Sequence, residues 1–121
     1  MISQTHIQTI KHLAQLFESN NISWKLVGSS NLALQGVEVT ANDIDIYVKP
    51  EDISRVDSLL NSTYQINDIQ IEVIAKLDTN SPITFVDLEG VKIPVPPLKD
   101  EYEAYLKFGK TEKAELIKKL L

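Results

Sequence analysis

The segment Asp43-Ile44-Asp45-Ile46-Tyr47-Val48 constrains the fold of this chain most strongly, because its polar and apolar residues alternate without interruption. Side chains two residues apart on a β-strand point to the same face, so the segment predicts a strand with one apolar and one polar face. Ile44 and Ile46 then enter a core, while Asp43 and Asp45 stand side by side on the opposite face. Such a sheet needs helices or a second layer against its apolar side.

Helical and strand-like periods follow one another along the rest of the 121 residues. The predicted elements are helix 4–17, strand 22–27, helix 31–35 capped by Ser29 or Ser30, strand 43–48, a helix opened by Pro50, strand 69–77, a hairpin of strands 83–86 and 91–95 turning at Glu89-Gly90, helix 98–108, and helix 111–121 capped by Thr111. This order predicts an α+β (two-layer α/β) fold, with helices packed on a mixed β-sheet, as one domain over residues 1–121.

Composition narrows the classes of function. The 43% hydrophobic content is typical of a globular protein, and the chain has no cysteine for a disulfide or a thiolate metal site. It has neither an apolar run of about 20 residues nor a secretory signal, so we expect a cytoplasmic protein without a membrane segment. The net charge of -5 excludes a general nucleic-acid-coating surface. Residues 1–97 carry six basic and twelve acidic groups, and an acidic body needs divalent cations to bind a nucleotide.

Asp43 and Asp45 are the first candidates for chemistry. Two carboxylates held side by side repel each other, and one of them tends to stay protonated unless a cation lies between them. Mg²⁺ removes this repulsion, since it takes oxygen ligands and accepts one or two carboxylates together with phosphates and water. The alternative is a solvated strand face that happens to carry two acids.

Gly28 and Ser29 form a second candidate site, because a strand that ends in Gly-Ser and leads into a helix presents free backbone N–H groups to an anion. Glycine permits the close approach of a phosphate, and the Ser29 hydroxyl can donate a hydrogen bond to it, with Ser30 as a further donor. The alternative is a plain helix cap without a ligand.

Glu72 is the third candidate. It lies among aliphatic residues in the strand predicted over 69–77, where an unpaired buried carboxylate would be costly. If this strand lies beside the strand of Asp43 and Asp45, Glu72 completes a three-carboxylate cluster. The alternative is an acid on the solvent side of an edge strand.

Together these residues resemble the nucleotidyltransferase superfamily of the DNA polymerase β type. The family pattern is an apolar residue followed by Gly-[Gly/Ser], then two acids separated by one apolar residue, then a later acid in an apolar strand. Gly28-Ser29, Asp43-Ile44-Asp45 and Glu72 match it, and the segment 24–36 is similar to the strand, turn and helix of small minimal and aminoglycoside-type members. The resemblance covers most of the chain.

The resemblance implies transfer of a nucleoside monophosphate from an NTP to an acceptor hydroxyl. In that case Gly28, Ser29 and Ser30 hold phosphates, and Asp43, Asp45 and Glu72 bind Mg²⁺ or Mn²⁺. Glu72 also acts as a general base toward the acceptor. Lys107 and Lys110 then add positive charge near the phosphates, although both also fit the solvated face of a helix.

The sequence does not determine the substrates of this reaction. The nucleotide is unidentified, and the acceptor is a small molecule, a protein or RNA. A short chain has little room for an acceptor-binding domain, so acceptor binding falls to a homodimer interface or to a partner protein. The alternative function is an inactive module of the same fold that binds a nucleotide or a partner, for example as one half of a two-protein system. His6 and His12, six residues apart on the first helix, are expected to have surface or packing roles.

Overall fold

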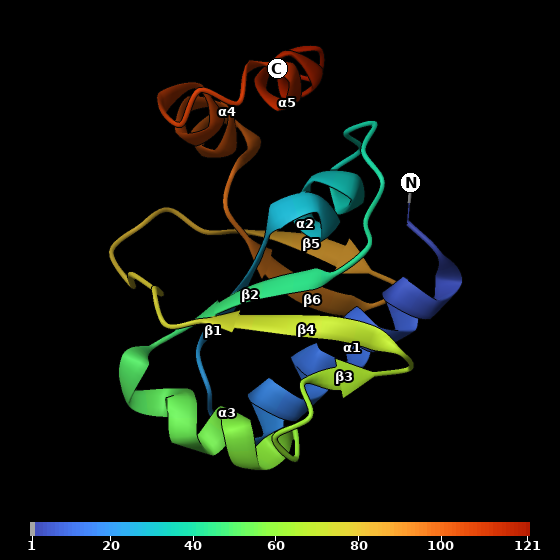
Figure 1. The fold of residues 1–121 in the computed structure, drawn as a ribbon, viewed down its shortest axis with the longest axis vertical. Coiled ribbons are helices and arrows are strands. Elements are labelled where there is room, and N and C mark those ends of the chain that lie inside the picture. Colours follow the sequence, from blue (N-terminus) through green and yellow to red (C-terminus); the bar gives the residue numbers. More distant parts are fainter. Residues whose placement is uncertain (1) are drawn as a thin grey trace.

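The computed structural model describes residues 2–121 and contains a central sheet with helices on both of its faces (Figure 1). In chain order the elements are α1 Gln4–Ser19, β1 Trp24–Val27, α2 Gly28–Leu34, β2 Ile44–Val48, the 3-10 helix η1 Pro50–Asp52, α3 Ile53–Leu59, β3 Gln65–Ile66, β4 Ile69–Ile74, β5 Thr84–Leu88, β6 Val91–Val95, α4 Leu98–Lys107 and α5 Thr111–Lys118. This arrangement confirms the predicted α+β class and the mixed sheet.

Four strands form the main sheet in the order β1-β2-β4-β3. Strand β2 pairs antiparallel with β1 and parallel with β4, and β3 pairs antiparallel with β4. The β5–β6 hairpin is a second, two-stranded sheet, and its strand β6 lies beside β1. Glu89 and Gly90 both have positive φ angles at the hairpin turn, 53° and 88°, as the twist of a two-residue hairpin loop requires.

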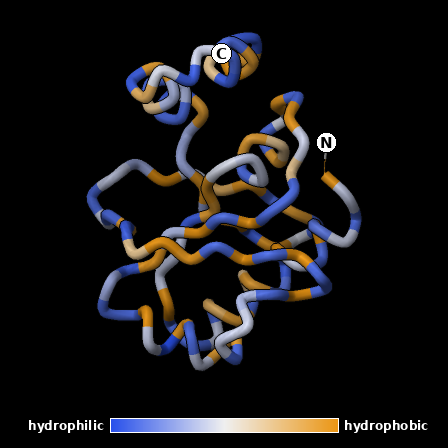
Figure 2. The backbone as a smooth tube through the Cα atoms, in the orientation of Figure 1, coloured by the Kyte–Doolittle hydropathy of each residue, from blue (hydrophilic) through white to orange (hydrophobic). Residues whose placement is uncertain are grey.

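The apolar face of the main sheet carries the larger core. Ile44, Ile46 and Val48 of β2 are fully buried there, and Leu26 of β1 pairs with Ile46 in the register of the two strands. Helix α1 covers this face with an apolar stripe at helical spacing (Ile10, Leu13, Ala14 and Phe17), and α3 adds Val56. Figure 2 shows apolar residues recurring along the central strands. The prediction that Ile44 and Ile46 enter a core is therefore confirmed.

Helices α4 and α5 form a hairpin at one end of the molecule, next to α2 (Figure 1). A second, smaller apolar cluster joins this hairpin to α2 and to the loop after it. Leu32, Val37 and Ile117 are its buried members, and Tyr102 and Tyr105 pack against them. The hairpin thus lies on the opposite side of the sheet from α1.

The predicted helix caps are wrong, although the helices themselves form. Helix α2 begins at Gly28, with Val27 as its N-cap and no capping side chain, so neither Ser29 nor Ser30 precedes it. Thr111 is the first residue of α5 rather than its cap. Both helices are anchored through apolar side chains, which makes a polar cap dispensable. The short strand β3 was not predicted, and its two residues are too few to show a period.

Within residues 2–121, the longest apolar helical stretches fall short of what crossing a membrane requires.

Candidate active site

The polar face of the main sheet brings together two of the three predicted acids. Asp45 of β2 is directly opposite Glu72 of the parallel strand β4 and opposite Val27 at the end of β1. Residues directly opposite each other in neighbouring strands point to the same face, so the two carboxylates are neighbours. The condition on which the role of Glu72 depended, a strand next to that of Asp43 and Asp45, is therefore met.

Gly28 follows Val27 directly and lies against the Asp45 carboxylate. A Cβ atom added at Gly28 would be 3.2 Å from Cγ of Asp45 and 3.3 Å from its Cβ, and would overlap Oδ2. Gly28 also has a φ angle of +71°, which side chains disfavour. Glycine is therefore needed at position 28 because a side chain there would overlap the Asp45 carboxylate. The sequence alone did not reveal this requirement.

Asp45 is half-buried, and its Oδ1 atom is a buried atom with no hydrogen-bond partner among residues 2–121. Burial raises the pKa of Asp45 from 3.8 to about 6, and a hydrogen bond shared with Glu72 and the negative charges of Glu72 and Asp43 act in the same direction. The positive charge of Lys113 opposes them. Binding of a cation would be favourable at an unpaired carboxyl oxygen that has several negative charges around it.

Asp43 lies one residue before β2 and is exposed. Ser30 fixes its backbone, because the Ser30 hydroxyl donates a 2.8 Å hydrogen bond to the carbonyl of Asp43. Ser30 is itself only 1% exposed. Its hydroxyl is therefore directed at the chain that carries the acids, and Ser29 is the hydroxyl residue of the turn that is left partly exposed.

Glu72 is exposed on the same face, and among residues 2–121 no three His, Asp or Glu side chains are grouped closely enough to hold a metal ion. The structure brings Asp45 and Glu72 together and places Asp43 near enough for its charge to act on Asp45. A preassembled three-carboxylate cluster is absent from that part of the chain. The oxygen-only donor set and the unpartnered Oδ1 of Asp45 nevertheless fit Mg²⁺ or Mn²⁺, which can draw flexible, exposed carboxylates together.

The α4–α5 hairpin adds groups that the sequence did not single out. The pKa of Tyr105 of α4 is raised to about 12 by burial first, then by the negative charge of Glu101, and then by the negative charge of Asp45. Tyr105 therefore lies near Asp45. Lys113 of α5 is the lysine whose charge reaches Asp45, and its Nζ lies 5.6 Å from the centre of the Tyr105 ring.

The two lysines predicted near the phosphates lie farther out. Lys107 is exposed at the end of α4, and Lys110 is exposed with its Nζ 5.9 Å from the centre of the Tyr105 ring. Lys113 was missed because its segment shows an ordinary helical distribution of charge.

A buried polar group lies beneath α4. Lys25 is only 5% exposed, and its charge lowers the pKa of Glu101, whereas burial raises that pKa by more. Asn31 Nδ2 donates to Glu101 across 3.4 Å, and its Oδ1 accepts a 2.6 Å hydrogen bond from Gln35. A lysine inside the apolar strand 22–27 was the available signal for this group. The Asn31–Glu101 hydrogen bond joins α4 to α2.

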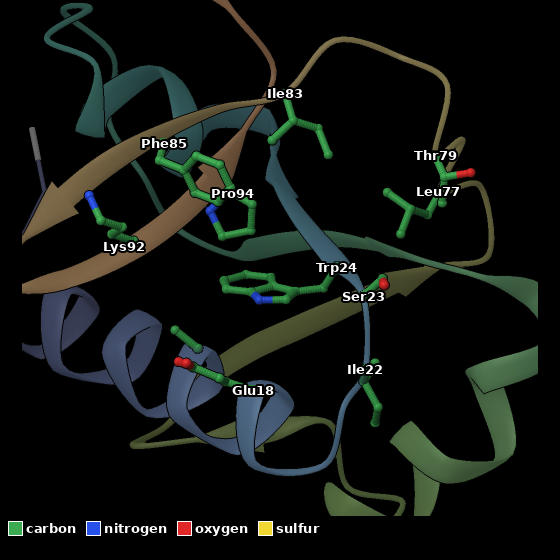
Figure 3. Close-up of a pocket in the computed structure, with 11 residues that line it drawn as sticks. Glu18, Ile22, Ser23, Trp24, Leu77, Thr79, Ile83, Phe85, Lys92 and Pro94 are labelled. Carbon is green, nitrogen blue, oxygen red and sulfur yellow. The ribbon is translucent and has the colours of Figure 1, made fainter.

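An apolar pocket lies elsewhere in the protein. It has a volume of about 460 Å³ and is lined by Trp24, Phe85 and Pro94, among others (Figure 3). The Trp24 ring contacts Phe17 of α1, with 5.5 Å between the ring centres, so the pocket belongs to the α1 side of the sheet. None of the predicted site residues lines it.

Solved structures share the fold of this chain. A candidate nucleotidyltransferase of Thermotoga maritima is 28% identical, with a TM-score of 0.79 over 99% of this chain and 94% of that chain. The chain has a nucleotidyltransferase fold. A nucleotidyltransferase-like antigenic protein of Paracoccidioides brasiliensis has a TM-score of 0.70 at 13% identity, over 98% of this chain and 77% of that chain.

The enzyme ANT(2″)-Ia, solved in complex with adenylyl-2″-tobramycin, has a TM-score of 0.62 at 12% identity, over 94% of this chain and 88% of that chain. At these low identities the second and third likenesses concern the nucleotidyltransferase fold alone. No protein-family model matches the chain, and no curated protein matches its sequence. The predicted resemblance is thus confirmed at the level of the fold.

Proposed function

We propose that this chain transfers a nucleoside monophosphate from an NTP to an acceptor hydroxyl, with pyrophosphate leaving, and that the transfer depends on Mg²⁺ or Mn²⁺. One observation carries the proposal: the Asp45 carboxylate, with its unpartnered Oδ1, is packed against Gly28 and beside Glu72 in a nucleotidyltransferase fold. Raising the pKa of a carboxyl to about 6 is costly for a purely structural residue and is typical of functional sites.

Asp43, Asp45 and Glu72 are the residues that would hold the divalent cation. A bound cation would neutralise the charge that develops on the attacking and leaving oxygens. Asp45 supplies the fixed, half-buried ligand, because its strand is paired on both sides. Asp43 and Glu72 are exposed and supply the adaptable ligands.

Gly28 and Ser29 would bind the β- and γ-phosphates through the free N–H groups of the turn and the Ser29 hydroxyl. The acceptor oxygen would attack the α-phosphorus while the bond from that phosphorus to the leaving pyrophosphate breaks. Glu72 would take the proton of the attacking hydroxyl, since it is exposed toward solvent and lies next to Asp45. Lys113 would balance part of the negative charge of the phosphates.

A transfer assay tests the proposal. The wild-type protein is incubated with Mg²⁺ or Mn²⁺ and each of the four α-labelled NTPs, together with small hydroxyl compounds, protein or RNA as acceptors. We expect label on one acceptor class and equimolar pyrophosphate. Asp45→Asn and Glu72→Gln should each abolish the transfer, because the first removes a ligand and the second the base. Transfer that persists in Asp45→Asn would refute the proposed site.

A non-catalytic module is the second candidate. One observation favours it: residues 2–121 contain no group of three His, Asp or Glu side chains already arranged around a metal position. This candidate predicts stable association with a nucleotide or a partner chain without release of pyrophosphate from any NTP. Pyrophosphate release that requires Asp45 would exclude it.

A further inference from the structure

We propose that His6 is a positioning residue of this site, holding in place the backbone that delivers Asp43. The inference rests on the proposed function, in which Asp43 is a metal ligand. His6 belongs to α1, whereas Asp43 precedes β2 and follows His6 by 37 positions in the sequence. His6 would act through the main chain of residues 42 and 43 and would not touch the substrate.

Both ring nitrogens of His6 are engaged. Nε2 lies 3.1 Å from the carbonyl oxygen of Asn42, and Nδ1 lies 3.2 Å from the Ser3 hydroxyl. A carbonyl oxygen can only accept, so Nε2 carries a proton and donates, and in the neutral ring Nδ1 then accepts from the Ser3 hydroxyl. His6 is 7% exposed, and its tautomer is therefore set by partners that water does not replace.

The backbone held by His6 has few other constraints. Within the described residues, 40–42 make no backbone–backbone hydrogen bond, and β2 begins only at Ile44. The carbonyl of Asn42 is held by His6 from α1, and the carbonyl of Asp43 is held by Ser30 from α2. Two consecutive carbonyls are thus fixed from two helices, directly before the strand that carries Asp45.

A side chain that only packs would not need this geometry. Ala41 of the same loop is also buried, so burial of this segment does not depend on the His6 ring alone. What the ring adds is the direction of the Asn42 carbonyl. Because Asp43 follows in the chain, that direction sets where its exposed carboxylate emerges relative to Asp45. Groups that orient metal ligands in this way typically change metal affinity by about 10- to 100-fold when they are removed.

Two substitutions separate the two ring nitrogens. His6→Gln places an amide N–H near the position of Nε2 and can donate to Asn42, whereas His6→Asn reaches only the position of Nδ1 and loses that hydrogen bond. Both replace a buried ring by a smaller amide and should lower the melting temperature similarly. Thr9→Ala is the control, since Thr9 is another buried polar residue of α1, and its hydroxyl bonds the Thr5 carbonyl and the Asn67 amide instead of residues 42 and 43.

Two readouts are measured on the full-length protein: hydrogen exchange of the backbone amides of residues 42–45, and the affinity for Mn²⁺ alone by electron paramagnetic resonance. We expect faster exchange and about tenfold weaker Mn²⁺ binding in His6→Asn. His6→Gln should keep wild-type values of both, and Thr9→Ala should have a lower melting temperature without changing either readout.

Wild-type exchange in His6→Asn, or equal changes in His6→Gln and His6→Asn, would overturn the role of His6 and leave the proposed function standing. Wild-type protein that binds no Mn²⁺ would instead overturn the metal site of the proposed function, and with it the purpose assigned to His6.

Discussion

Replacing Asp45 by asparagine should stabilise the metal-free protein at neutral pH. The pKa of Asp45 is raised from 3.8 to about 6, so its contribution to stability is complete below pH 3.8 and is lost as the pH rises through 6. A shift of this size corresponds to about 3 kcal/mol in the free energy of unfolding, which contact with water reduces to about 1–2 kcal/mol for a half-buried group. Asparagine keeps the shape of the side chain and removes its charge.

The assay is thermal unfolding of wild type and Asp45→Asn at intervals from pH 4 to pH 8 without divalent cations. The melting temperature of the variant should rise relative to wild type by about 4–8 °C across this range, with most of the change between pH 4 and pH 6, the interval that separates the unfolded and folded pKa values. Asp68→Asn is the matched control, because Asp68 is exposed in the turn between β3 and β4, and it should show no such trend. A difference that is independent of pH, or that falls as the pH rises, would refute the electrostatic reasoning.

Three further outcomes follow from the geometry. Gly28→Ala should lower the free energy of unfolding in urea by about 1–3 kcal/mol more than Gly90→Ala does. Both glycines have positive φ angles, but only Gly28 lies against a side chain. Equal losses of unfolding free energy would contradict that contact. Alkaline absorbance titration should show one tyrosine with a titration midpoint near pH 12, and this titration should be absent from Tyr105→Phe. If it persists in that variant, Tyr105 is not the buried tyrosine with the raised pKa. Lys113→Met should raise the pKa of Asp45 further in a carboxyl ¹³C titration, and an unchanged pKa would place that lysine away from the site.

The sheet and its acids could be predicted from the sequence because they obey local rules. The alternation over Asp43–Val48 sets which side chains face the core. The same period in the strand of Glu72 puts the buried Ile71 on the core face and the Glu72 carboxylate on the other face of the sheet. Register alone then brings Glu72 beside Asp45. A two-residue turn at Glu89-Gly90 is likewise encoded within a few residues.

The rest of the site depends on contacts between distant segments. Tyr105 and Lys113 reach Asp45 only because Pro96-Pro97 ends β6 and the α4–α5 hairpin packs back on α2. The spacing of His6 and His12 predicted surface or packing roles, and it carried no information about the bond from His6 to Asn42. Interactions of this kind have no period, so a single sequence does not reveal them.

The proposed metal-dependent nucleotide site is tested most directly by the melting temperature of the protein with an NTP at millimolar concentration, in the presence and absence of Mg²⁺. A ligand that binds only the folded state raises the melting temperature in proportion to the free energy of binding. We expect NTP with Mg²⁺ to raise the melting temperature of wild type, NTP alone to raise it less, and Asp43→Asn with Asp45→Asn to remove the shift. An unchanged melting temperature of wild type with Mg²⁺ and each of the four NTPs would contradict the account.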